Sequence, residues 1–179
     1  MSGVPKGRRE KHDFLATHNL MKIRKEVTEL AVYSFGYNKE RQDKKIERFE
    51  EWAAKNGKED VIAWMRAKNG GFYEEFVEEE TRETRQILRN AVAEYELGNT
   101  IFPSGDSKME EYREKRAHLN RAAGHLHVLI QELQYIADIL PCDKNKYAAL
   151  IQTIREEIRL IKGVRRAANK YLREQPRKG

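Results

Sequence analysis

Residues 119–168 read LNRAAGHLHVLIQELQYIADILPCDKNKYAALIQTIREEIRLIKGVRRAA, and this stretch decides the fold class. Apolar residues recur every three or four positions on both sides of Pro141, which is the spacing of one helical face. Pro141 ends the first helix, Asp143 caps the second, and Ser107 with Glu110 forms a capping-box pattern where the first begins. The stretch therefore predicts two long amphipathic helices joined by a tight turn. Their expected core positions are Leu119, Ala122, Leu126, Leu129, Ile130, Leu133, Ile136, Ala137 and Leu140, then Tyr147, Leu150, Ile151, Ile154, Ile158, Ile161 and Ala168.

Two further helices are expected towards the N-terminus. One begins near Asp13, a plausible N-cap, and ends at Gly36. The other covers residues 73–97 and ends at Gly98; its acidic start is either a solvated face or a docking surface for a basic partner. Without any alternating strand pattern, the sequence predicts an all-α, up-down-up-down four-helix bundle, with residues 1–179 as a single domain.

The segments outside the four long helices have their own signals. Asn-Gly and Gly-Gly breaks divide residues 38–72 into two short helices, which predicts an inserted helical hairpin between helices one and two. Its two tryptophans, Trp52 and Trp64, are expected to pack this hairpin onto the main body. Residues 1–12 are expected to form a basic flexible arm, and residues 174–179 a basic tail.

The positive charge is concentrated near the two ends of the chain. The 179-residue chain carries a formal net charge of +6, with charged residues at 36% of the composition, and its isoelectric point is about 9.3. At about 100° per residue, six cations of the last helix fall on one stripe beside its apolar face. A further cation, Arg165, points near the apolar direction, so either the helix outruns the bundle there or Arg165 pairs with a partner.

Cations at the start of helix one would lie at the same end of an antiparallel bundle and would join that stripe. Lysine and arginine side chains grouped in this way bind phosphates, with strong salt dependence and little sequence preference. The candidate nucleic-acid-binding residues are Lys6, Arg8, Arg9, Lys11, Arg155, Arg159, Lys162, Arg165, Arg166, Lys170 and Arg173.

Several other classes of protein are disfavoured. A single cysteine, Cys142, excludes an intrachain disulfide and a cysteine-based zinc finger, and it suits a reducing cytoplasm. No apolar run approaches the ~20 residues of a membrane span. No phosphate-binding glycine loop, serine-hydrolase elbow or zinc-protease motif is present, so we expect no cofactor, no metal and no catalytic residues. His118 and His125 share a helical face but lack neighbouring ligands.

Two alternatives remain open. Helical-bundle ribonucleases of the HEPN class carry an arginine followed four to six residues later by a histidine, and Arg113 with His118 and Arg121 with His127 match that loose spacing. The other alternative is a purely structural oligomer, whose interfaces could use spare apolar and aromatic residues. Those residues are Phe72, Tyr112, Tyr135, Tyr171 and Leu172.

Residues 125–171 carry a recognisable pattern. Its landmarks are Gln131-Glu132-Leu133-Gln134-Tyr135, Ile139-Leu140-Pro141, Asp143, Asn145-Lys146-Tyr147, Lys162-Gly163 and Arg165-Arg166, and RKEVTELAVYSFGYN from Arg24 to Asn38 also fits. The chain resembles the accessory variability determinant (Avd) family of diversity-generating retroelements, small four-helix-bundle proteins encoded beside reverse transcriptases. It is more distantly similar to the bundle family encoded in ribosomal-RNA intervening sequences. The resemblance implies a homopentamer that binds the reverse transcriptase and its template RNA and supports mutagenic cDNA synthesis.

Overall fold

The structure is a computed structural model that describes residues 6–69 and 71–173, with side chains for residues 15–58, 60–66 and 71–168. All regular structure in these residues is helical, so the all-α class is confirmed. The elements are α1 (Lys6–Val32), a 3₁₀ turn η1 (Ser34–Gly36), α2 (Lys39–Lys55), α3 (Glu59–Asn69), α4 (Phe72–Thr100), α5 (Lys108–Ile139) and α6 (Lys144–Arg173). None of the helices in the described residues combines the length and apolarity that a membrane crossing requires.

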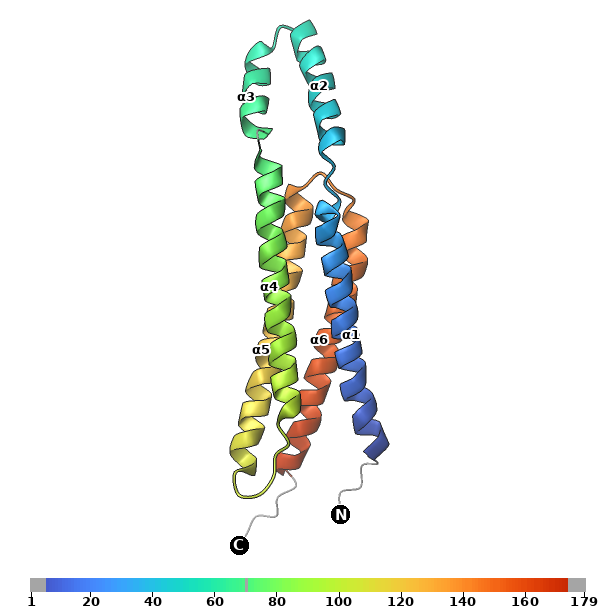
Figure 1. The fold of residues 1–179 in the computed structure, drawn as a ribbon, viewed down its shortest axis with the longest axis vertical. Coiled ribbons are helices and arrows are strands. Elements are labelled where there is room, and N and C mark those ends of the chain that lie inside the picture. Colours follow the sequence, from blue (N-terminus) through green and yellow to red (C-terminus); the bar gives the residue numbers. More distant parts are fainter. Residues whose placement is uncertain (1–5, 70, 174–179) are drawn as a thin grey trace.

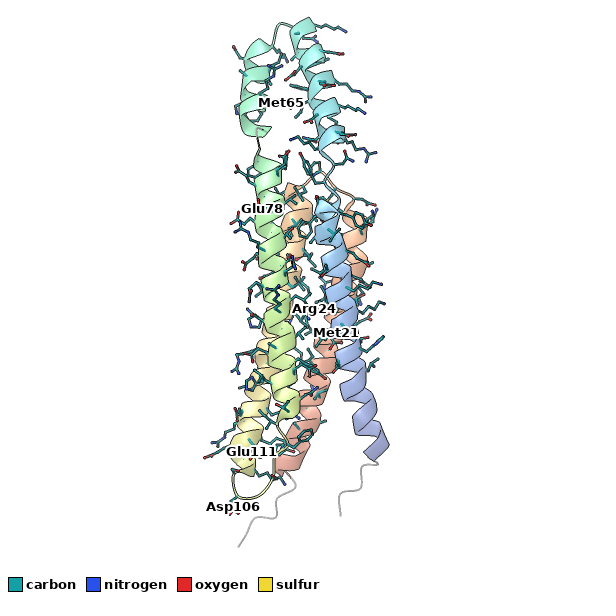
Figure 2. All side chains as sticks on the ribbon, in the orientation of Figure 1. Met21, Arg24, Met65, Glu78, Asp106 and Glu111 are labelled. Atoms are coloured by element: carbon teal, nitrogen blue, oxygen red, sulfur yellow. The ribbon has the colours of Figure 1, made fainter. Side chains whose placement is uncertain are left out.

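The four long helices α1, α4, α5 and α6 run side by side and are called the body below (Figure 1). Within the body α4 packs against α5, α5 against α6, α6 against α1, and α1 against α4. Their apolar faces meet in one continuous core, and Figure 2 shows side chains filling the space between them. The short helices α2 and α3 form a hairpin that extends beyond one end of the body.

The apolar residues that recur every three or four positions mark the observed core of α5 and α6. Every expected core position of α5 is buried, and so is every expected position of α6 except Ala168, which is half-buried. Along α1 the buried positions are Ala16, Leu20, Ile23, Val27 and Ala31. Burying this many aliphatic side chains, at about 25 cal/mol per Å² of apolar surface, supplies the main driving force for folding.

Two expected helix ends are wrong. Helix α1 begins at Lys6 and not near Asp13, so the arm expected over residues 1–12 is helical from Lys6 onward. Most of residues 6–12 are arginine, lysine and glutamate, which have high helix propensity and extend the helix backwards. Residues 1–5 and the expected basic tail at residues 174–179 lie outside the described residues.

The second wrong end is at Gly98, where α4 does not stop but continues to Thr100. This glycine is buried against α5, and a Cβ there would lie 3.3 Å from both the Cβ of His118 and the Cγ of Leu119. The residue therefore allows α4 and α5 to approach closely and does not act as a helix terminator. A glycine signal in sequence has both meanings, and only the neighbouring helix distinguishes them.

The start of α5 also differs from the expected capping box. Ser107 stands at the N-cap, but its hydroxyl donates to Glu111 Oε1 at 3.0 Å and accepts no capping hydrogen bond from a backbone amide. The other oxygen of Glu111 accepts from the Ser104 amide at 2.8 Å. Glu111, one residue after the expected Glu110, therefore closes the loop. At the start of α6 the expected cap is found, because Asp143 Oδ1 accepts from the Asn145 amide at 3.0 Å.

The hairpin is present as predicted, but its tryptophans do not pack onto the body. Trp52 is 47% exposed and Trp64 is 60% exposed, because α2 and α3 lie beyond the ends of the long helices. The described part of α2 buries only Ala53. The hairpin is held by local contacts: the rings of Phe49 and Trp52 lie 5.4 Å apart, and two nitrogens of Arg66 donate to both oxygens of Glu50 at 2.6 and 2.8 Å.

Glycine substitutions test the close approach of α4 and α5. Gly98→Ala places a methyl group against the Cβ of His118, which cannot rotate away. We therefore expect a lower melting temperature and a free energy of unfolding that is smaller by about 1–2 kcal/mol. Gly124→Ala is the matched control, since a Cβ there meets nothing within 4 Å. The control should gain about 0.5–1 kcal/mol from higher helix propensity. An equal rise of the melting temperature in both variants, measured by thermal unfolding, would contradict the role of Gly98.

Candidate nucleic-acid interface

Helix α6 separates its charges from its apolar residues by face. Its buried side faces the core, and a neighbouring arc carries cations, most of which are exposed. Arg155, Arg159 and Arg166 are exposed, and Lys162 is half-buried. We call Arg155, Arg159, Lys162 and Arg166 the α6 ridge.

The C-terminal part of the ridge lies beside α5. Lys162 Nζ is 3.3 Å from His127 Nε2, and Arg165 Nη1 donates to Asn120 Oδ1 at 2.6 Å. Both contacts are made to side chains of α5. Of the two alternatives for Arg165, pairing is therefore correct, and its partner Asn120 belongs to the same chain. Arg165 is half-buried and its Nε has no hydrogen-bond partner, so it acts first as a helix–helix contact.

The ridge cations do little for the stability of α6. Arg155 and Arg159, and then Lys162 and Arg166, stand four residues apart, where like charges repel by about 0.2–0.5 kcal/mol per pair. None of these four makes an ion pair with any described acidic side chain within 4.0 Å. A helix face that is locally unfavourable, and whose three arginines are exposed, can bind an external anion.

The remaining candidate cations lie outside the described side chains. These are Lys6, Arg8, Arg9, Lys11, Lys170 and Arg173. Their backbones belong to the start of α1 and the end of α6, which lie at the same end of the body (Figure 1). The merged patch of both clusters stays a prediction.

The arginine–histidine pairs of the ribonuclease alternative are not brought together. His118 Nδ1 lies 2.8 Å from both Glu94 Oε2 and Arg121 Nη2, and Arg121 Nε donates to Glu94 at 2.8 Å. His127 instead faces Lys162 of α6, and Arg113 is exposed. Each histidine thus makes its hydrogen-bond contacts with residues other than the arginine that its spacing suggested.

The Glu94 cluster has the character of a structural contact between α4 and α5. Burial opposes ionisation of Glu94, but the hydrogen bonds from His118 and Arg121 outweigh it and lower the pKa of this carboxyl. The side chain of His118 is only 14% exposed. Among the side chains that the structure describes, no group of three histidine, cysteine or acidic residues is placed to hold a metal ion.

Among the described side chains, two acidic ones are buried in the body without ion pairs. Glu157 of α6 is 0% exposed, and neither of its oxygens makes a hydrogen bond of good geometry, although the side chain of Asn19 is near enough to oppose the effect of burial. Burial raises the pKa of Glu157 from 4.5 to about 7. The pKa of Glu80 in α4 is also raised to about 7, by burial and by the nearby charge of Glu132.

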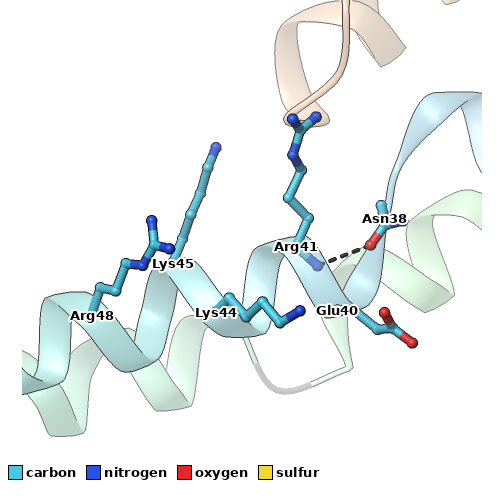
Figure 3. Close-up of a pocket in the computed structure, with 6 residues that line it drawn as sticks. All are labelled: Asn38, Glu40, Arg41, Lys44, Lys45 and Arg48. Carbon is cyan, nitrogen blue, oxygen red and sulfur yellow. Dashed lines mark hydrogen bonds between the residues drawn. The ribbon is translucent and has the colours of Figure 1, made fainter.

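A second group of cations was not anticipated. Arg41, Lys44, Lys45 and Arg48 all lie on one side of α2, where they line a shallow hollow with Asn38 and Glu40 (Figure 3). The signal was in the sequence, as cations spaced by three, four and seven residues. The expectation that the hairpin packs against the body assigned no free surface to these cations.

No family model, curated protein or solved structure that was compared with this chain matches it. The site is therefore interpreted from its own chemistry.

Stability should depend on pH through Glu157. A carboxyl whose pKa is higher in the folded than in the unfolded state binds its proton more tightly when folded, so the free energy of unfolding falls as pH rises from 4.5 to about 7. Glu157→Gln removes this effect. At pH 8 it should raise the melting temperature and increase the free energy of unfolding by up to about 3 kcal/mol, whereas at pH 4 it should change neither. The exposed neighbour Glu156 supplies the control, Glu156→Gln. A stabilisation by Glu157→Gln that is the same at both pH values would refute the assignment.

Proposed function

We propose that this protein is a non-catalytic accessory subunit that binds RNA, and that its partners are a reverse transcriptase and the template RNA of a diversity-generating retroelement. The observation that carries the RNA-binding part is the α6 ridge, a row of cations without ion-pair partners along an exposed helix face. Such a row can contact the phosphates along a strand and reads no base edges. Binding through it is electrostatic, so its affinity depends on salt.

The identity of the partners is supported by the resemblance to the Avd family. Members of that family are four-helix bundles, and the order and packing of α1, α4, α5 and α6 support the up-down-up-down topology that the periodicity predicts. The resemblance also implies a homopentamer. Exposed apolar side chains on the outside of α4 and α5 could serve contacts between copies, and of the expected spare residues Phe72 and Tyr135 are exposed whereas Tyr112 is buried.

The RNA-binding role is tested by replacing the exposed arginines of the ridge. The triple variant Arg155→Gln, Arg159→Gln and Arg166→Gln removes three phosphate contacts, so the slope of log affinity against log salt should become shallower by about 2–3. RNA affinity at physiological salt should fall at least about tenfold. Filter binding or fluorescence anisotropy over a salt series measures both, with the wild-type chain as reference.

The control variant has the same loss of net charge elsewhere. Arg82, Arg85 and Arg89 are exposed on α4, but their helix face also carries Glu75 and Glu78, which balance them. Changing these three arginines to glutamine should leave the affinity and the slope close to those of the wild type. If both triple variants lose affinity equally, the protein binds through its overall charge and the ridge has no special role.

The same preparations decide whether the protein is a ribonuclease. We expect labelled RNA to stay intact after long incubation with the wild-type chain in the absence of metal. Cleavage that is lost in His118→Ala or His127→Ala would overturn the non-catalytic assignment. Either histidine must then meet RNA in an arrangement that differs from its present contacts with Glu94 and Lys162.

A further inference from the structure

The faces of helix α2 differ in chemistry. At 100° per residue, its apolar face (Ile46, Phe49 and Ala53) is directed at α3, and an arc well apart from it carries Glu40, Glu47 and Glu51. Between that acidic arc and the apolar face lies an arc about 100° wide that carries only cations and one tryptophan, and the arc opposite it is mixed in charge. We call the arc of cations and tryptophan the α2 stripe, and it consists of Arg41, Lys44, Lys45, Arg48, Trp52 and Lys55.

The four cations of the α2 stripe that line the hollow are exposed, and none of them makes an ion pair with a described acidic side chain. Figure 3 shows Arg41, Lys45 and Arg48 extending from the same side of the helix. Their position is also unfavourable for the helix, because Arg41 lies in the first turn, where a cation opposes the helix dipole. Elsewhere the hairpin does form ion pairs, as between Arg66 and Glu50. Among the described residues, the stripe cations therefore share with the α6 ridge the lack of an ion-pair partner.

Trp52 continues the stripe one turn beyond Arg48 and remains 47% exposed. Its ring packs against Phe49 on one side, and Lys58 Nζ lies 5.2 Å from the ring centroid. An exposed indole ring among cations is the combination that binds unpaired nucleic acid, since bases stack on the ring while phosphates meet the cations. The acidic arc beside it limits the positive surface to the width of one helix face, which fits a single strand.

We infer that the α2 stripe is a second RNA-binding surface, which holds an unpaired segment of the strand through phosphate contacts and stacking on Trp52. This inference rests on the proposed function, because it takes its ligand to be the same class of RNA that the α6 ridge binds. The two surfaces are well separated. A Cβ on Gly36 would lie 3.5 Å from the Cβ of Cys142, so the chain enters α2 close to the start of α6, and the helical rise from there places Arg48 and Arg155 about 30 Å apart along the long axis.

The stacking part is tested with the full chain and an oligouridine probe. The protein has two tryptophans, so Trp64→Phe leaves Trp52 as the only one and Trp52→Phe leaves Trp64. Oligouridine should quench the emission of the Trp64→Phe protein and leave that of the Trp52→Phe protein nearly unchanged. Trp52→Ala should weaken binding about tenfold.

The charge part uses a triple variant, Arg41→Gln, Lys45→Gln and Arg48→Gln, with the α4 triple variant as control. We expect about a tenfold loss of affinity and a shallower salt dependence, with unchanged helicity by circular dichroism. If the ridge variant loses affinity while the stripe variant matches the control and Trp52 is not quenched, the inference fails and the proposed function stands. If the wild-type chain binds no RNA, both fail.

Two competitors separate RNA from other anionic partners. Polyglutamate supplies negative charge without bases, and phosphatidylserine vesicles supply phosphates on a surface. Neither should displace oligouridine from the Trp64→Phe protein at equal charge concentration. Displacement by polyglutamate would assign the stripe to an acidic protein, and a blue shift of Trp52 on vesicles would assign it to a membrane; either result overturns the inference.

Discussion

The hydrogen bond from the Tyr147 hydroxyl to the Phe35 carbonyl oxygen, 2.7 Å long and buried, fixes the point where the chain leaves the body for the hairpin. Ser34, Phe35 and Gly36 all have positive φ there, which is costly for a bulky residue such as phenylalanine. Full burial of the Phe35 ring and the bond from Tyr147 offset that cost. Burial also raises the pKa of the Tyr147 hydroxyl above its ordinary value, so the group stays a donor. The end of α1 is thereby attached to the start of α6, and α2 is directed away from the body.

This attachment explains why the hairpin is exposed. A hairpin folded back along α1 and α4 would bury Trp52 and Trp64 and would cover part of the body. The turn at Phe35 prevents this, and in the described residues α2 and α3 contact mainly one another and the start of α4. The core of the hairpin itself is small, because Ala53 is the only buried side chain described in α2. The exposed surface of the hairpin is therefore a consequence of the turn geometry, and the charges on it are accessible for binding.

Sequence periodicity predicted the core because burial in a long helix repeats every three to four residues, and α5 and α6 keep that repeat for many turns. The same periodicity could not show how far each helix is covered, which depends on where the neighbouring helices end. The exposure of Trp52 and the continuation of α4 through Gly98 both depend on such neighbours. For the candidate site, the cations of the α6 ridge were predicted by residue, because an exposed face needs no partner to define it. The contact of Arg165 with Asn120 needed the register between α5 and α6, which one sequence does not contain.

Helix α6 combines two features that both reduce its stability. One face carries like charges four residues apart, and the core side carries Glu157, whose burial favours the protonated form. A fold optimised only for stability would replace the first with mixed charges and the second with an aliphatic residue. Phosphate binding would explain why the ridge contains only cations, since an acidic residue at any of these positions would repel the ligand. Its distance of about 30 Å from the α2 stripe then matters, because one strand that reaches both surfaces makes the second contact intramolecular. Two weak, salt-dependent contacts on one rod-shaped molecule would hold an extended strand more tightly than either contact alone.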